Sequence, residues 1–189
     1  AISAGAGAIA TLGVALWWAA HLYKRLAPDH RARMGDAGKG AVTAALVLAV
    51  ILMVVGYGRA DGAFFWGPSP ALVGINNLLV LVAFYLFAAS GMKTRVTAYT
   101  GHPMLWGFSL WAVAHLLVNG DTPSFVLFGG LLAWALTEMV VINRASLWAR
   151  PAGPFPARKE AMAAAGAVIV MLVVGLIHGW IGPWPFGGA

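Results

Sequence analysis

The sequence predicts an all-α membrane protein, a polytopic bundle of six transmembrane helices with both chain termini on the extracytoplasmic side. First, 61% of the 189 residues are hydrophobic and only 10% are charged, whereas about a quarter of a soluble domain would be charged. Second, the apolar residues gather in six runs, each close to the length that crosses a bilayer. Third, the basic residues fall almost entirely in alternate connections between these runs.

The six predicted spans follow one another along what we expect to be a single integral membrane domain over residues 1–189. The apolar runs cover residues 8–26, 41–58, 71–92, 104–118, 124–142 and 161–181. The fourth run is short, and we expect residues 99–103 to extend it. No positively charged region precedes the first run, so we expect a first span rather than a cleaved signal peptide.

The basic residues give the predicted orientation. Between the first and second spans lie Lys24, Arg25, Arg31, Arg33 and Lys39. If alternate connections face the cytoplasm, 11 basic residues lie inside and one, Arg59, lies outside. Such an asymmetry predicts that both termini are extracytoplasmic.

Proline and glycine mark the predicted connections. Residues 119–123 read Asn-Gly-Asp-Thr-Pro, which predicts a tight turn between antiparallel fourth and fifth spans. Three prolines at 151, 154 and 156 predict an extended linker before the last span. The Trp- and Pro-rich residues 180–186 are typical of an interfacial anchor.

Several function classes are excluded. The chain has no cysteine, which excludes disulfides, thiolate metal sites and cysteine nucleophiles. The Gly56-Tyr57-Gly58 pattern does not follow a strand, so it does not predict a dinucleotide site. The net charge of +6 is explained by membrane topology, and no nucleic-acid partner is expected.

The histidines are the strongest candidates for a functional site. His30 lies in a basic connection and is interpreted as a solvated residue. The other four, His21, His102, His115 and His178, lie within or at the ends of spans, where polar side chains are costly and usually functional. His102 and His115 are 13 residues apart, which puts them about 20 Å and about 140° apart on a straight helix. Each therefore needs a partner from another span.

Two imidazoles facing each other across a bundle satisfy a six-coordinate haem b, which needs no cysteine for attachment. Phe108 and Trp111 suit a flat apolar macrocycle as cofactor-binding side chains. A membrane histidine can equally serve as a hydrogen-bond partner between helices. The residues alone leave both interpretations open. Glu138 is interpreted as a structural partner, of Arg95, Arg144 or a histidine, because no second carboxylate lies within a span.

One segment carries a family resemblance. It comprises Gly101-His102-Pro103-Met104-Leu105-Trp106-Gly107 and the Trp111-to-Asp121 stretch that ends in Asn119-Gly120-Asp121. This segment resembles the NnrU family of bacterial membrane proteins, whose wider family includes the zeta-carotene isomerases. Gly101 departs from the Arg-His-Pro pattern of that family. Asn119 is expected to orient His115, since the two are four residues apart.

The resemblance implies a haem b whose iron is held by His115 and, from the first span, by His21. By depth in the predicted topology His21 lies nearer the inner side than His115. His178 is therefore the alternative partner for His115, and His102 the alternative partner for His21. In each case the metal is the haem iron.

The resemblance also implies a multi-pass protein of the bacterial inner (cytoplasmic) membrane with a role linked to denitrification, that is, to nitrite and nitric oxide metabolism. Three hypotheses follow. The first is a haem b protein with a redox or sensing role, open to a small gaseous ligand. The second is a haem-dependent isomerase acting on a polyene or other lipophilic substrate that enters from the membrane lipid. The third is a cofactor-free accessory or assembly subunit that binds a respiratory complex or a second copy of the chain. A methyltransferase is disfavoured, because Gly101 breaks the motif and Glu160 is the only carboxylate near the last span.

Overall fold

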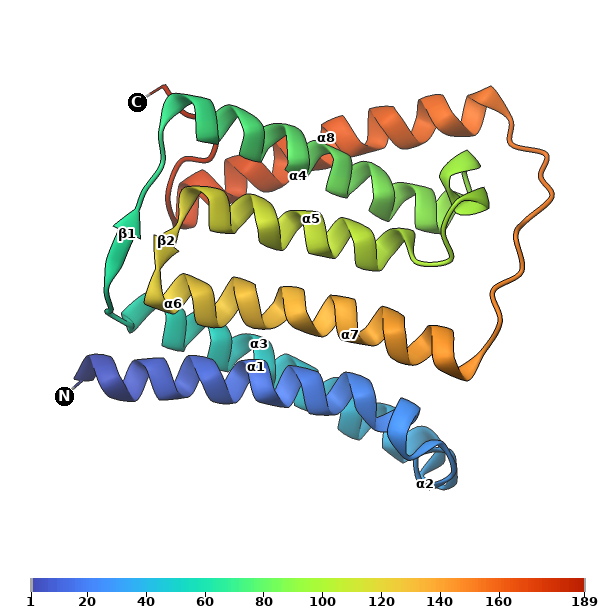
Figure 1. Ribbon diagram of the computed structural model, residues 1–189, viewed down its shortest axis with the longest axis horizontal. Helices are drawn as coiled ribbons and strands as arrows, with labels where there is room; N and C mark the ends of the chain where they lie inside the picture. Colours follow the sequence, from blue (N-terminus) through green and yellow to red (C-terminus); the bar gives the residue numbers. More distant parts are fainter. Residues whose placement is uncertain (1, 189) are drawn as a thin grey trace. The chain divides into compact units, whose positions relative to one another are not determined.

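The computed structural model describes residues 2–188, and its regular elements are helices apart from two short paired strands (Figure 1). The elements in chain order are α1 (Ile2–Leu26), α2 (Pro28–Arg33), α3 (Gly35–Arg59), β1 (Phe64–Trp66), α4 (Pro70–Met92), η1 (Arg95–Ala98), α5 (Pro103–Val118), β2 (Gly120–Asp121), α6 (Thr122–Ser124), η2 (Phe125–Gly129), α7 (Gly130–Ala145) and α8 (Ala157–Ile181). Helices dominate because long apolar stretches in lipid must satisfy their backbone groups internally.

Five stretches of helix are long and apolar enough to cross a membrane, judged by length and composition among the described residues. They are Gly5–Leu26, Gly35–Arg59, Pro70–Met92, Thr122–Ala145 and Ala157–Ile181. The apolar helix α5 is shorter, at 16 residues. The chain is therefore an all-helical, multi-pass membrane protein, as predicted.

The predicted extension of the fourth span is wrong. Residues 99–102 are not helical, and α5 begins at Pro103. Proline favours the first turn of a helix and disfavours helical backbone in the residue before it. His102 accordingly has φ −128° and ψ 49°, outside the helical region.

The basic connection between the first two spans is helical rather than an open loop. Lys24 and Arg25 lie in the last turn of α1, and Pro28 begins the short helix α2. Gly35, with φ +57°, separates α2 from α3 because glycine adopts this backbone conformation without strain. The basic side chains are thus fixed to helix ends.

The chain forms two compact units. The first comprises residues 1–65 and 120–142. In it α1 packs along α3 at very close range (Figure 1). A Cβ atom at Gly56 would lie 2.7 Å from Ala10 Cα, and one at Gly13 would lie 2.8 Å from Met53 N. Small residues allow such backbone approach in membranes, so Gly56 serves helix packing.

The fifth apolar stretch completes the first unit. It is a continuous helix made of α6, the π-helical turn η2, and α7. Asp121 caps its start by accepting a hydrogen bond from Ser124 N at 2.8 Å. Trp18 of α1 donates from Nε1 to Gly130 O at 2.9 Å, which ties α1 to the start of α7. The predicted turn at residues 119–123 is confirmed as a short connection over residues 119–121.

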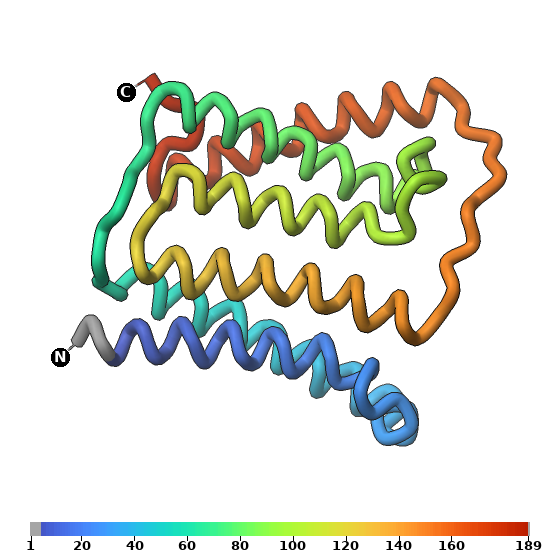
Figure 2. The backbone as a smooth tube through the Cα atoms, viewed as in Figure 1, coloured from blue at the N-terminus to red at the C-terminus, as the bar shows by residue number. Residues whose placement is uncertain are grey.

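The second unit comprises residues 66–119 and 143–189, and in it α4 packs against both α5 and α8. A Cβ atom at Gly107 of α5 would lie 2.9 Å from Ala83 O of α4. Glu160 of α8 accepts hydrogen bonds from Tyr85 Oη at 2.5 Å and from Arg95 N at 2.7 Å. The proline-rich linker before α8 is extended, as predicted (Figure 2).

The C-terminal segment after α8 folds back onto that helix. Its two aromatic rings, Trp184 and Phe186, lie 5.3 Å apart and cover Gly179 and Gly175. His178 Nδ1 donates to Pro183 O at 2.6 Å and closes the turn. The Trp- and Pro-rich segment therefore packs against its own helix.

Candidate functional site

His21 lies on α1 with its ring held from two sides. Its Nδ1–H donates to the carbonyl oxygen of Trp17, one turn earlier, at 3.0 Å. The ring centroid is 4.3 Å from that of Trp17 and 4.6 Å from that of Trp134 on α7. With the proton on Nδ1, the neutral ring carries its lone pair on Nε2, the nitrogen that binds metals in this tautomer.

His115 lies on α5 in the same local arrangement. Its Nδ1–H donates to the carbonyl oxygen of Trp111 at 2.8 Å, and the two ring centroids are 4.7 Å apart. Phe108 stands one turn earlier, 5.2 Å from Trp111. These three side chains follow one face of α5, because positions three and four apart are neighbours on a helix. The two side chains predicted to face the macrocycle, Phe108 and Trp111, thus lie beside the predicted ligand.

The two histidines share a pentapeptide that the sequence interpretation missed. Residues 17–21 read Trp-Trp-Ala-Ala-His and residues 111–115 read Trp-Ala-Val-Ala-His, so both follow the pattern Trp-x-x-Ala-His. The Trp–His interplanar angles are also alike, at 49° and 47°. The signal was available as a tryptophan four residues before each histidine. One copy lies in each compact unit.

His102 is arranged differently. Its Nε2–H donates to Asn143 Oδ1 at 2.7 Å, and its backbone N–H donates to Thr100 Oγ1 at 3.0 Å. The Nε2 atom of His102 is thus engaged with an amide, whereas the hydrogen bonds to Trp17 and Trp111 use the Nδ1 atoms of His21 and His115. The side chain holds the start of α5 in place, which is the role expected of a histidine that precedes a helix-starting proline.

The position that departs from the Arg-His-Pro pattern is covered by an aromatic ring. A Cβ atom at Gly101 would lie 2.6 Å from Trp148 Cδ1. Any side chain at residue 101 would therefore displace the Trp148 indole. Nearby, the Arg150 guanidinium lies 5.4 Å from the centre of the Tyr99 ring.

The remaining two histidines are both hydrogen-bonded. His178 Nδ1 holds the C-terminal segment, and His178 is close enough to His115 in the second unit to act on it electrostatically. His30, predicted as a solvated residue, is exposed, and its Nδ1 is bonded to the hydroxyl of Tyr23.

Glu138 pairs with a residue that the sequence did not indicate. The carboxylate lies on α7 and is buried, and its Oε1 accepts from Arg25 Nε of α1 at 3.3 Å. The predicted partners Arg95 and Arg144 are wrong. The observed partner, Arg25, is 113 residues away in the sequence. It is brought close by the packing of α1 on α7, which the sequence alone does not show.

Asn119 acts on the backbone of His115. Its Nδ2 donates to the His115 carbonyl oxygen at 2.8 Å. It therefore closes the last turn of α5. The sequence had predicted that Asn119 would orient the His115 imidazole, and that prediction is wrong. The ring is oriented by the Trp111 carbonyl instead.

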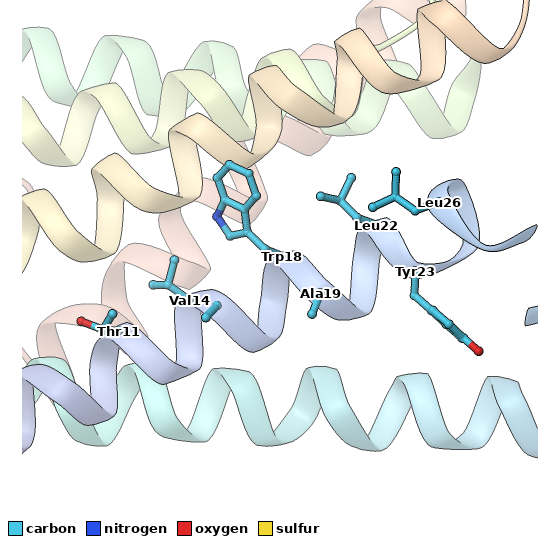
Figure 3. Close-up of a pocket in the computed structure, with 8 residues that line it drawn as sticks. Thr11, Val14, Trp18, Ala19, Leu22, Tyr23 and Leu26 are labelled. Carbon is cyan, nitrogen blue, oxygen red and sulfur yellow. The ribbon is translucent and has the colours of Figure 1, made fainter.

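A groove of about 630 Å³ runs along α1 of the first unit (Figure 3). Its lining residues are Thr11, Val14, Ala15, Trp18, Ala19, Leu22, Tyr23 and Leu26. No histidine is among them. Within residues 2–188, no group of three or more His, Cys, Asp or Glu side chains could hold a bare metal ion. A haem iron needs only two protein ligands.

The comparisons with known proteins identify a family. The family described as NnrU protein matches residues 9–185, nearly the whole chain. No curated protein and no solved structure matches the chain significantly.

Proposed function

Since the chain belongs to the NnrU family, we propose that it is a haem b-binding integral membrane protein with a redox or sensing role in nitrite and nitric oxide metabolism. His21 and His115 would hold the haem iron. The observation that carries this proposal is the shared Trp-x-x-Ala-His arrangement, which fixes both imidazoles in the same tautomer. Bound haem would supply one-electron redox chemistry.

Each histidine fits an axial role by its own surroundings. A metal-binding histidine ordinarily donates its other ring N–H to a carbonyl or carboxylate, which fixes the ring and strengthens its donor nitrogen. The carbonyls of Trp17 and Trp111 do this for His21 and His115. The adjacent indole rings provide apolar walls of the kind that a macrocycle packs against.

The other two histidines are weaker candidates for different reasons. His102 would have to give up its Nε2 hydrogen bond to Asn143 in order to bind iron through that nitrogen. His178 keeps its lone pair on Nε2, since its Nδ1–H is held by Pro183 O. It is therefore the second candidate for the partner of His115, ahead of His102, whose Nε2 donates to Asn143.

The proposed topology is six spans in the bacterial inner membrane, with α5 as the short fourth span. At 1.5 Å per residue, the 16 residues of α5 extend about 24 Å, somewhat less than a hydrocarbon core of about 30 Å. The distribution of basic residues supports extracytoplasmic termini. The apolar groove on α1 contacts none of the histidines, so it gives no argument for the isomerase alternative.

The test is an absorption spectrum of the detergent-purified protein, oxidised and dithionite-reduced, with a pyridine haemochrome assay for haem type and stoichiometry. The protein is produced with ample haem supply. We expect a b-type spectrum with sharp reduced α and β bands and one haem per chain. A featureless visible spectrum contradicts the haem proposal and leaves the cofactor-free accessory subunit as the better account.

A further inference from the structure

A buried ion pair lies one helical turn from His21. Glu138 is only 4% exposed, and its partner Arg25 follows His21 by four residues on the same face of α1. The side chain of Arg25 is 33% exposed. Charged side chains in this setting are costly in a membrane and call for a specific role.

The negative charge of Glu138 is only partly compensated. Arg25 Nε reaches Oε1 at 3.3 Å, whereas Oε2 is buried and has no hydrogen-bond partner in residues 2–188. Glu138 also lies near His21, because it follows Trp134 by one turn of α7 and the Trp134 ring centroid is 4.6 Å from that of His21. In a buried setting the field of this carboxylate is weakly screened, so it extends to whatever the imidazole binds.

We propose that the Arg25–Glu138 pair sets the reduction potential of the group bound at His21, with Glu138 lowering the potential and Arg25 offsetting part of that effect. This inference rests on the proposed haem function. Reduction adds one negative charge to the site, and a fixed carboxylate opposes it. Neither residue is proposed as a ligand of the iron. Both act on the reduction potential through their electrostatic field at the His21 ring.

A purely structural role makes a different prediction. If the pair only holds α1 against α7, removing one partner and removing both weaken the same contact. Haem retention then follows the stability of that contact, which the single variant weakens more than the double because it leaves one charge unpaired, and the midpoint potential of the haem that stays bound does not change. An electrostatic role instead predicts a displacement of the potential in Glu138→Gln that is reversed when the positive charge is removed as well.

The experiment is a spectroelectrochemical titration of the haem in the full-length protein. The variants are Glu138→Gln, Glu138→Asp and the double variant Arg25→Gln/Glu138→Gln. The control is Asp36→Asn, which removes a carboxylate from the exposed Asp36–Lys39 pair of α3. We expect Glu138→Gln to raise the midpoint potential and the double variant to return toward the wild-type value. Glu138→Asp and Asp36→Asn should leave it near wild type.

Two results overturn the inference while the haem proposal stands. One is an unchanged potential in Glu138→Gln, in a protein that binds haem and loses it on His21→Ala. The other is a shift in Asp36→Asn as large as that in Glu138→Gln.

If wild-type protein binds no haem, or if His21→Ala leaves haem binding intact, the function proposed for His21 fails and this inference falls with it. Should Glu138→Gln prove too unstable to purify, Arg25→Gln decides the outcome. It keeps the Glu138 carboxylate without its partner, so the midpoint potential should fall below the wild-type value, and an unchanged potential contradicts the inference.

Discussion

The two Trp-x-x-Ala-His segments have the same local geometry in very different surroundings. On α1, His21 is enclosed by Trp17 and Trp134 and stands near the ion pair of Glu138. On α5, His115 continues an aromatic row and has His178 in electrostatic range. The shared part fixes ring orientation, whereas the different parts set the charge around each ring. The proposed haem binding and the proposed electrostatic tuning of the haem therefore depend on different residues.

The largest effect expected from this comparison comes from removing either ring. His21→Ala and His115→Ala should each abolish stable haem retention, because a single axial imidazole and the apolar walls do not replace the lost bond. His30→Ala is the matched control, since His30 is exposed on α2. Haem per chain, from the pyridine haemochrome assay, measures the outcome. Full retention in His115→Ala together with loss in His102→Ala would show that the ligands are misassigned.

The next effect concerns the packing that positions each helix. Gly56→Ala puts a Cβ atom against the Ala10 backbone of α1, and Gly107→Ala puts one 2.8 Å from Phe87 Cε1. We expect each to lower the free energy of unfolding by about 1–3 kcal/mol. Thermal unfolding in detergent measures it.

The controls are Gly58→Ala and Gly91→Ala, where a Cβ atom meets nothing within 4 Å. Both should be neutral, or stabilising by up to about 1 kcal/mol, because alanine is the better helix former. Equal destabilisation of control and test variants would contradict the close approach of these helices.

A smaller effect is expected from the tryptophans. Trp17→Leu and Trp111→Leu keep the backbone carbonyl but remove the ring that packs on each imidazole. Aromatic pairs contribute about 0.5–1.5 kcal/mol, so haem affinity should weaken by about 2- to 10-fold. Trp180→Leu, at a site that is 86% exposed, is the control. Titration of apoprotein with haem measures the affinity. Unchanged affinity in both variants would show that the tryptophan rings do not contribute and that only the hydrogen bond from histidine to the backbone carbonyl matters.

The smallest effect is expected at the Tyr85–Glu160 contact of the second unit. Tyr85→Phe removes a hydroxyl that donates to Glu160 Oε2 and should cost about 0.5–1 kcal/mol of unfolding free energy. Haem content should not change, since this contact joins α4 to α8 away from either motif. Tyr99→Phe, at an exposed ring, is the control. Loss of haem in Tyr85→Phe would show that this contact supports the site.

The positions of the helices were largely predictable, because apolar runs of bilayer length leave little freedom. The five long helices follow the predicted runs. The starts of the long helix α4 at Pro70 and of the shorter helix α5 at Pro103 reflect the proline rule for first turns. The extension of α5 failed for the same reason, since the residue before Pro103 resists helical backbone. The helical form of the connection at α2 was not predicted, because the charges of this segment indicate membrane orientation and not backbone conformation.

The sequence alone was enough to propose candidate site residues, but not to predict the contacts that those residues make. The four histidines in or near the spans were proposed because polar side chains are costly in a membrane and because of their spacing. Nothing in a single sequence shows that Asn143 holds His102 or that Arg25 reaches Glu138. Those contacts join residues 41 and 113 positions apart, and they depend on which helix faces meet. The repeated pentapeptide is different, because its i to i+4 hydrogen bond follows from helix geometry alone.

The central claim is that one iron is held by one histidine from each motif, and chemical rescue tests it most directly. His21→Gly and His115→Gly are purified with and without added imidazole, and the ferric spectra are recorded by electron paramagnetic resonance. Each variant alone should lose the low-spin bis-imidazole signal, and added imidazole should restore it in both. A low-spin signal that persists in either variant without imidazole would contradict the assignment of that histidine as a ligand.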